Sequence, residues 1–228
     1  MARVLFLGYP LDDGGTPHQA MAALHLARAG HAVRFLAWGK GAGLRNAPHY
    51  VPKLEYVVMP KDGIRSAILF AWRIRRELAE FQPDVFYVQG AQQTPFALVA
   101  SRFKPKYARV YHTQDYLEPG RHMRYQLFEE RFARASDAVI INEPNRGRFM
   151  QSFYRLREAP VVVPTGLPRW WPVPNRTEKR RREFLAKHGF EGPSEDYRIV
   201  IAGGGYGPVR CSSHLVEAFA TLPSNYVL

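Results

Sequence analysis

Residues 2–19 read ARVLFLGYPLDDGGTPHQ, and this stretch decides the fold. The apolar run at residues 4–7 is short and continuous, which is typical of a strand buried on both faces in a parallel sheet. Thr16 followed by Pro17 is typical of a helix start, and Gln19 completes a capping box with Thr16. The helix then shows one apolar side and stops at Gly30, so the stretch predicts a strand, a loop and a helix.

The loop of this unit carries a glycine pair, Gly14 and Gly15, directly before the helix. Backbone amides and the positive end of a helix dipole can bind an anion or a polar ligand at such a place. The unit therefore favours a nucleotide- or sugar-handling domain. A dinucleotide is disfavoured, because the loop lacks the three-glycine fingerprint and the strand at residues 32–37 is followed by Trp38 and Gly39 rather than by a carboxylate.

The chain after this unit alternates between apolar strands and helices. Strands are expected near residues 32–37, 55–58, 85–88, 108–111, 138–141 and 161–163, and helices near residues 64–81, 94–103, 124–135 and 145–154. Alternation of this kind predicts an α/β fold built on a doubly wound parallel sheet.

Composition divides the chain into three parts. We expect a Rossmann-like domain at residues 1–168, a proline-rich linker at 169–176, and the start of a second α/β domain at 177–228. The last part has a basic helix, a strand near residue 199 and the glycine loop 203–205, which repeats the order of the N-terminal unit. One strand and two helices cannot bury a core alone, so the second domain is expected to be incomplete.

The chain is basic, with 228 residues, a formal net charge of +12 and a pI of about 10.0. A generally basic surface, a nucleotide-sugar ligand or an anionic membrane surface would each account for this charge, whereas nucleic acid is disfavoured because no recognition motif is present. Cys211 is the only cysteine, which excludes an intrachain disulfide and favours the cytoplasm. No apolar stretch is long enough to span a bilayer, and the first residues do not form a signal peptide.

The helix expected at residues 64–81 has two interpretations. Its apolar residues fall on one side and its arginines largely elsewhere, with Phe70 and Trp72 nearby. The pattern fits a crossover helix with a solvated basic face, and it also fits a helix that lies at a membrane interface. The apolar side expected from this spacing consists of Ile64, Ile68, Ala71, Ile74 and Leu78.

Several segments together resemble the retaining glycosyltransferases of GT-B architecture, family four. The resemblance covers nearly the whole chain and rests on the opening glycine pair and on residues 29–33, 129–140, 161–167 and 215–219. It implies an N-terminal domain that shapes the acceptor site, and a second domain that grips the nucleotide-sugar.

The resemblance also assigns residues to roles. His112, at the end of a strand, is similar to the family histidine that contacts the transferred sugar, and it is the expected catalytic residue. The expected substrate-binding residues are Asp12, Asp13, Gly14, Gly15 and Asp115, and the expected diphosphate-binding residues are Gly204, Gly205 and Arg210. Basic side chains and helix N-termini would stabilise the leaving diphosphate without a metal or another cofactor. In a retaining reaction the departing phosphate oxygen can take the proton of the acceptor hydroxyl.

Three positions depart from the family pattern: Gly205 replaces an arginine, Thr165 an asparagine and Glu143 a serine. The chain also stops as the second domain begins, which predicts a truncated enzyme with weak or no transfer activity. An alternative is a binding or assembly module that needs a partner chain for the missing half. A third hypothesis is peripheral attachment to the inner face of the membrane through residues 64–81 and the Trp170-Trp171 pair.

Overall fold

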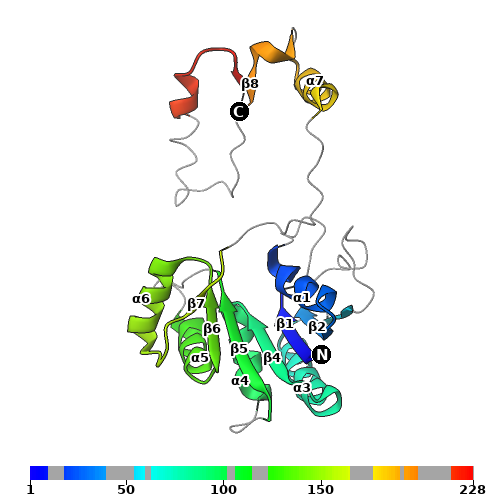
Figure 1. The fold of residues 1–228 in the computed structure, drawn as a ribbon, viewed down its shortest axis with the longest axis vertical. Helices are drawn as coiled ribbons and strands as arrows, with labels where there is room; N and C mark the ends of the chain where they lie inside the picture. The colour runs from blue at the N-terminus through cyan, green and yellow to red at the C-terminus, as the bar shows by residue number, and fades with distance from the viewer. Residues whose placement is uncertain are drawn as a thin grey trace. The chain divides into compact units, whose positions relative to one another are not determined.

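The computed structural model describes residues 1–9, 18–39, 54–59, 63–101, 106–114, 123–164, 177–190, 193–199 and 217–227 (Figure 1). The chain divides into two compact units, Met1–Trp171 and Pro172–Leu228.

The first unit contains a seven-stranded sheet in which every neighbouring pair is parallel. The strand order β3-β2-β1-β4-β5-β6-β7 places the first strand beside the fourth, so the chain winds outward in both directions from the middle. The doubly wound parallel sheet predicted from the sequence is confirmed. The strands are β1 (Arg3–Gly8), β2 (Ala32–Trp38), β3 (Leu54–Met59), β4 (Val85–Gln89), β5 (Ala108–Thr113), β6 (Ala138–Ile141) and β7 (Val161–Val162).

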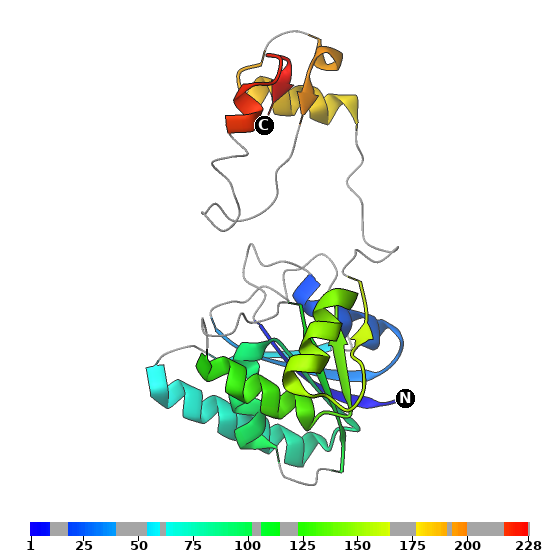
Figure 2. The same cartoon turned by 90° about the vertical axis from the view of Figure 1, so that its left-hand side faces the viewer.

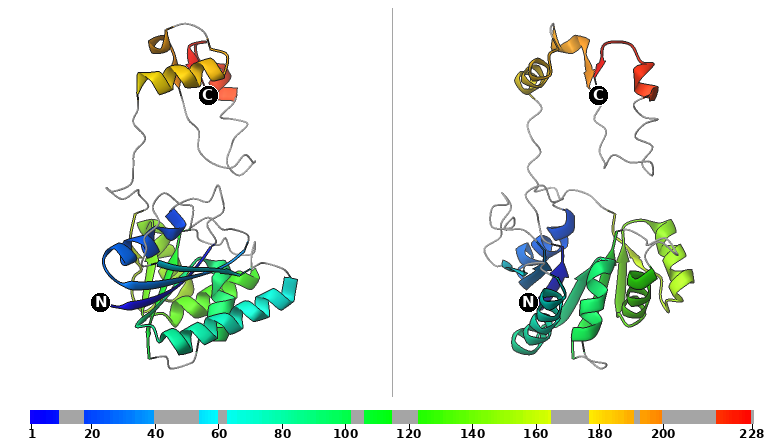
Figure 3. Two further views of the ribbon diagram at one scale, coloured as in Figure 1. Left: turned by 90° about the vertical axis from the view of Figure 1, so that its right-hand side faces the viewer. Right: turned by 180° about the vertical axis from the view of Figure 1, so that it is seen from behind.

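Helices cover both faces of this sheet. Helix α1 lies on one face, and α3, α4 and α5 lie side by side on the other (Figures 2 and 3). Helix α6 packs beside α5 and the last two strands. The helices are α1 (His18–Arg28), α3 (Gly63–Phe81), α4 (Thr94–Ala100), α5 (Met123–Arg134) and α6 (Pro144–Tyr154), with a 3-10 turn, η1 (Ala91–Gln93), before α4.

Two apolar layers form the core, one on each face. Leu5 and Leu7 of β1 join the layer beneath α3, α4 and α5, whereas Phe6 joins the layer beneath α1. On the α1 face, Phe6 stacks on Phe35 of β2 at 4.8 Å and on Tyr87 of β4 at 4.5 Å between ring centroids. These stacked rings fix the position of Tyr87. Because Tyr87 contacts a side chain of β5, the rings also help to position that side chain.

The side of α3 that packs on the sheet differs from the expected one. Ile74 is buried as predicted, but Ile64 and Ile68 are exposed. The buried positions are Ser66, Phe70, Ile74, Glu77 and Phe81. Two of these, Ser66 and Glu77, are polar and have hydrogen-bond or ion-pair partners within the fold. A prediction from the spacing of apolar residues alone misses them. Trp38 Nε1 donates to Ser66 Oγ at 3.4 Å, and the Glu77 carboxylate pairs with two arginines at 2.5 Å.

The second unit is described in three segments. Helix α7 (Glu178–Lys187) begins after Thr177, whose Oγ1 accepts the Arg180 amide at 3.4 Å. Strands β8 (Arg198–Ile199) and β9 (Tyr226–Val227) pair in parallel. The glycine loop 203–205 lies outside the described residues. Among the described helices, none combines the length and the apolar character needed to cross a membrane.

Candidate functional site

The strand order reverses direction between β1 and β4, which are neighbours although they are far apart in sequence. In open parallel sheets, ligands bind outside the carboxyl ends of the strands at such a reversal. Here Tyr9 follows β1 and Gly90 follows β4. A methyl group at Gly90 would lie 2.3 Å from the ring of Tyr9, and Gly90 has φ of +87°. Only glycine therefore allows the Tyr9 ring to lie against this turn.

His112 lies at the carboxyl end of β5, one strand further along the same edge. Its Nδ1 is 2.8 Å from the hydroxyl of Tyr87, and the two rings meet edge to face. The side chain is only 8% exposed, and this burial lowers the pKa of His112 to about 4. The imidazole is therefore neutral at pH 7.

The Tyr87 contact indicates which ring nitrogen of His112 carries the proton. Burial raises the pKa of Tyr87 well above its usual value, so the phenol keeps its proton and needs an acceptor. The structure gives this hydroxyl no partner among the described residues other than His112 Nδ1. Tyr87 Oη–H therefore donates to Nδ1, and Nε2 carries the ring hydrogen, an assignment inferred from the hydrogen-bond network. His112 thus offers an N–H donor from Nε2.

Gln89 lies directly beside His112, because the two residues are partners in the register of β4 and β5. Strand alternation puts Gln89 on the same face of the sheet as Tyr87. Gln89 is 2% exposed, and its Oε1 has no hydrogen-bond partner. Gln93, one turn later, has the same burial and the same unpaired Oε1. Buried carboxamide oxygens without a donor are uncommon, and each can accept a hydrogen bond from a ligand or a water molecule.

The sequence analysis missed Gln89 and Gln93. Both follow the apolar strand 85–88, as His112 follows its own strand, so the same signal was available for them. Together the edge offers an N–H donor at His112 and an amide acceptor at Gln89 beside it. A hydroxyl group, which both donates and accepts, suits this combination.

The N-terminus of α6 lies beside the end of β5, since Arg146 Nη1 donates to the Gln114 carbonyl at 2.7 Å. The Glu143 carboxylate caps this helix by accepting from the Asn145 and Arg146 amides at 2.8 and 2.7 Å. These backbone hydrogen bonds hold the pKa of Glu143 below its usual value. The amides that could bind an anion at this helix are thus already occupied by a carboxylate of the chain itself.

Of the predicted site residues, the structure describes His112 and places it at the carboxyl end of β5. The following predicted residues lie outside the described part of the chain: Asp12, Asp13, Gly14, Gly15, Asp115, Gly204, Gly205 and Arg210. Their proximity to His112 stays a prediction. Within the described residues, no three side chains of His, Cys, Asp or Glu gather closely enough to hold a metal ion.

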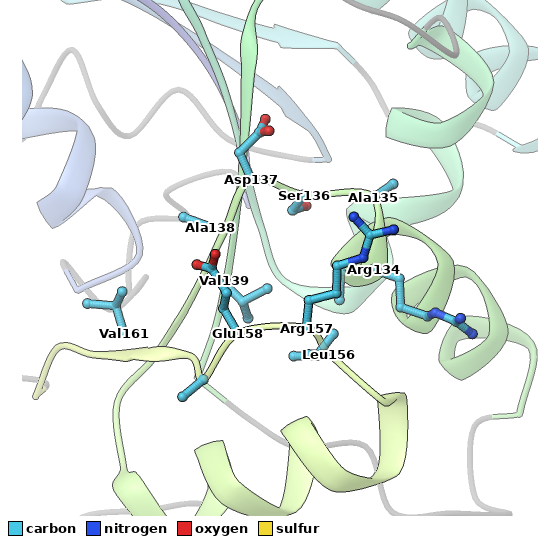
Figure 4. Close-up of a pocket in the computed structure, with 12 residues that line it drawn as sticks. Arg134, Ala135, Ser136, Asp137, Ala138, Val139, Leu156, Arg157, Glu158 and Val161 are labelled. Atoms are coloured by element: carbon cyan, nitrogen blue, oxygen red, sulfur yellow. The ribbon is translucent and has the colours of Figure 1, made fainter.

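A hollow of about 340 Å³ lies at the opposite edge of the sheet, around the amino end of β6 (Figure 4). Its two acidic and two basic side chains do not converge: the Asp137 carboxylate points away from Arg157 in Figure 4 and accepts the Arg109 amide at 2.7 Å. Arg134, on the other side, pairs with Glu130. The carboxyl ends of β1, β4 and β5 therefore remain the better candidate.

Comparison with known families gives a match over residues 13–169 to the family described as Glycosyltransferase Family 4. The matched segment spans more than half of the chain and includes β4, β5 and His112. A search of the curated proteins found no match.

Solved structures with a similar fold include three proteins of bacterial origin. HepE (Alr3699) of Anabaena, in complex with UDP and glucose, has a TM-score of 0.71 at 17% identity, and the alignment covers 99% of this chain and 60% of HepE. Sucrose-phosphate synthase of Thermosynechococcus elongatus gives 0.69 at 12% identity, with 98% and 60% covered. A glycosyltransferase of Rickettsia africae gives 0.68 at 13% identity, with 98% and 58% covered. The chain thus spans about 60% of the length of these structures, and at such identities the likeness concerns the fold.

Proposed function

The chain belongs to Glycosyltransferase Family 4, and we propose on that premise that it serves the transfer of a sugar from a nucleotide-sugar donor to an acceptor hydroxyl. The family match over residues 13–169 carries this proposal, because it assigns the reaction class. The geometry at the carboxyl edge of the sheet supports it, because a neutral N–H donor at His112 beside the unpaired amide oxygen of Gln89 suits the hydroxyls of a sugar.

His112 has a defined role in this proposal. Its Nε2–H donates to a hydroxyl of the transferred sugar, and Gln89 Oε1 accepts from the same or a neighbouring hydroxyl. A pKa of about 4, together with a proton on Nε2, makes His112 a poor general base at neutral pH. This fits a retaining transfer in which the departing phosphate oxygen takes the acceptor proton, so that the reaction needs no separate base.

The leaving diphosphate needs positive charge or N–H donors. We assign this task to Gly204, Gly205 and Arg210, without a metal ion, and substrate binding to Gly14 and Gly15. Asp12, Asp13 and Asp115 would bind acceptor hydroxyls. Since HepE was solved with UDP and glucose, UDP-sugars are the first donors to test.

In the domain arrangement that we propose, residues 1–168 form the domain that binds the acceptor, and residues 169–176 link it to a second domain. Residues 177–228 begin that second domain, which binds the donor. On that division this chain by itself transfers sugar weakly or not at all. The alternative, a binding module completed by a partner chain, makes the same prediction for the isolated chain. The two differ in that only the alternative requires a stable complex with a second protein. An anionic membrane is a further proposed partner, which α3 would contact.

The experiment combines binding and turnover. The purified chain is mixed with UDP-, GDP- and ADP-sugars, binding is followed by saturation-transfer NMR, and released nucleoside diphosphate is measured with and without EDTA. We expect one class of sugar nucleotide to bind, with slow release that EDTA does not change. His112→Ala and Gln89→Ala should weaken binding of the sugar moiety, and Gln92→Ala, an exposed neighbour, should not. Binding of none of the donors would contradict the proposed function, and rapid turnover would contradict weak activity.

A further inference from the structure

Gln93 carries a buried hydrogen-bond acceptor that the fold itself does not use. The side chain is 2% exposed, and its Oε1 has no hydrogen-bond partner within the part of the chain that the structure describes. Gln93 is the N-cap residue of α4, but its side chain makes no capping hydrogen bond. Glutamine is also not among the residue types that helix N-caps prefer. Helix capping therefore does not explain a glutamine at this position.

Other groups hold the turn at residues 90–93, which carries Gln93. The Gln93 backbone amide donates to the Gly90 carbonyl at 3.1 Å, and the buried Thr94 hydroxyl donates to the Ala91 carbonyl at 2.7 Å. The Gly90 amide donates to the His112 carbonyl at 2.8 Å, which ties the turn to β5. The carboxamide oxygen of Gln93 is not needed for any of these contacts. A buried acceptor without a donor destabilises a fold unless a molecule from outside supplies the donor.

This turn lies between the two places where segments with a proposed role in acceptor binding leave the sheet. The turn follows β4, which lies between β1 and β5 in the sheet. At the end of β1, the Tyr9 ring lies against Gly90, and Tyr9 precedes Asp12 and Asp13 in the sequence. The end of β5 precedes Asp115 in the same way. The unpaired oxygen thus belongs to the element that separates these two segments at the edge of the sheet.

The turn lies toward a different face of the sheet from the His112 side chain. His112 contacts Tyr87, which belongs to the core layer beneath α1. The 3-10 turn η1, which includes Gln93, packs against α5, and α5 covers the opposite face. A group that reaches Gln93 is therefore different from the sugar hydroxyls that we place at His112.

We propose that Gln93 Oε1 accepts a hydrogen bond from a hydroxyl group of the acceptor substrate, so that Gln93 helps to determine which acceptor binds. This role rests on the glycosyl transfer proposed above, in which the acceptor is a hydroxyl compound. A hydroxyl suits the position, because it donates to the oxygen without bringing a charge into a buried place. A fully ionised phosphate or carboxylate has no hydrogen to donate, and burial disfavours a charged donor such as an ammonium group. Gln93 therefore favours a neutral polyol or sugar as the acceptor.

The test is saturation-transfer NMR of the full chain with four neutral polyols as acceptor probes: glucose, galactose, mannose and myo-inositol. Gln93→Met keeps a side chain of similar length and removes the acceptor oxygen. We expect the unaltered chain to bind at least one of the polyols, and Gln93→Met to bind it about three- to tenfold more weakly, as the loss of one hydrogen bond implies. The matched control is Gln92→Met, the same substitution at the exposed neighbour in the turn, which should bind as the unaltered chain does.

Thermal unfolding without ligand separates this role from a structural one. Removing an acceptor that has no partner should leave the unfolding midpoint of Gln93→Met unchanged or raise it by about 2–4 °C. A midpoint lowered by more than about 4 °C would overturn the proposal, because the oxygen would then have a partner within the fold.

The binding data contain two further outcomes that would overturn the proposal. One is that no polyol binds to the unaltered chain, or that Gln93→Met binds the polyols equally well, since the oxygen would then hold a water molecule only. The other is that Gln93→Met weakens the binding of sugar nucleotides, which we expect it to leave unchanged, since Gln93 would then belong to the donor site. Polyol binding that depends on Gln93, in a chain that binds no sugar nucleotide, would contradict the proposed function but support the polyol site.

Discussion

Replacing His112 by asparagine should remove a large part of the acid sensitivity of the first unit. Burial lowers the pKa of His112 to about 4, whereas an unfolded histidine titrates near pH 6.5. Between these values the unfolded chain binds more protons than the folded chain, so stability rises with pH and is lost on acidification. The stabilisation of the folded state that depends on a neutral His112 is fully present above about pH 6.5 and fully lost at about pH 4.

The size of the effect follows from the linkage relation. A full shift of this size corresponds to about 3 kcal/mol, of which about 2 kcal/mol falls between pH 7 and pH 5. Asparagine cannot gain a proton in this range, and its short amide can still accept from Tyr87. The free energy of unfolding of His112→Asn should therefore change about 2 kcal/mol less between pH 7 and pH 5 than that of the unaltered chain.

Urea unfolding at the two pH values, followed by circular dichroism, measures this difference. Tyr87→Phe is the matched control, because it removes the hydrogen bond to His112 but leaves the ring buried between the same neighbours. That variant should lose about 1 kcal/mol at both pH values and keep the pH dependence. Equal pH dependence in His112→Asn and in the unaltered chain would refute the argument that burial keeps this imidazole neutral.

Three further substitutions test the interactions that hold the structure around the site. Glu77→Gln removes the buried carboxylate that pairs with Arg34 and Arg73, of which Arg34 keeps Glu55 as a second partner, and should lower the free energy of unfolding by about 1.5–3 kcal/mol in urea titrations. No loss would contradict the contribution of these ion pairs. Tyr154→Phe removes the hydroxyl that donates to Glu129 at 2.7 Å, and it should lower the free energy of unfolding by about 1.5–3 kcal/mol in the same assay. An unchanged free energy of unfolding would mean that this hydrogen bond does not contribute. Gly90→Ala should lower the free energy of unfolding by about 1–3 kcal/mol and weaken sugar binding. The added methyl strains a backbone with φ of +87° and displaces the Tyr9 ring. Unchanged stability and binding would show that this turn is not constrained.

The fold was predictable because each strand–helix unit carries its own local signals. Continuous apolar strands such as residues 4–7, followed by amphipathic helices, allow few arrangements other than a parallel sheet. The position of His112 at a strand end was predictable for the same reason, since carboxyl ends of parallel strands share one edge. The family resemblance then supplied its expected role.

The features that were not predicted depend on partners distant in sequence. Ser66 and Glu77 of α3 are buried because Trp38 and two arginines meet them in three dimensions, and this leaves Ile64 exposed. Judged by polarity alone, Ser66 and Glu77 would be exposed and Ile64 would be buried. The place of Gln89 at the end of a strand was visible in the sequence, but its burial beside His112 follows from the register of β4 with β5, which a single strand does not reveal.

The most direct test of the central claim is long-range nitrogen NMR of the ¹⁵N-labelled imidazoles during addition of the sugar nucleotides, at pH 7. We predict that His112 is neutral with its proton on Nε2, and that its Nε2 signal shifts in a saturable manner with a sugar nucleotide that binds, but not with the matching nucleoside diphosphate alone. The account is contradicted if His112 is protonated or carries its proton on Nδ1. It is equally contradicted if sugar nucleotides bind and leave the Nε2 signal of His112 unchanged.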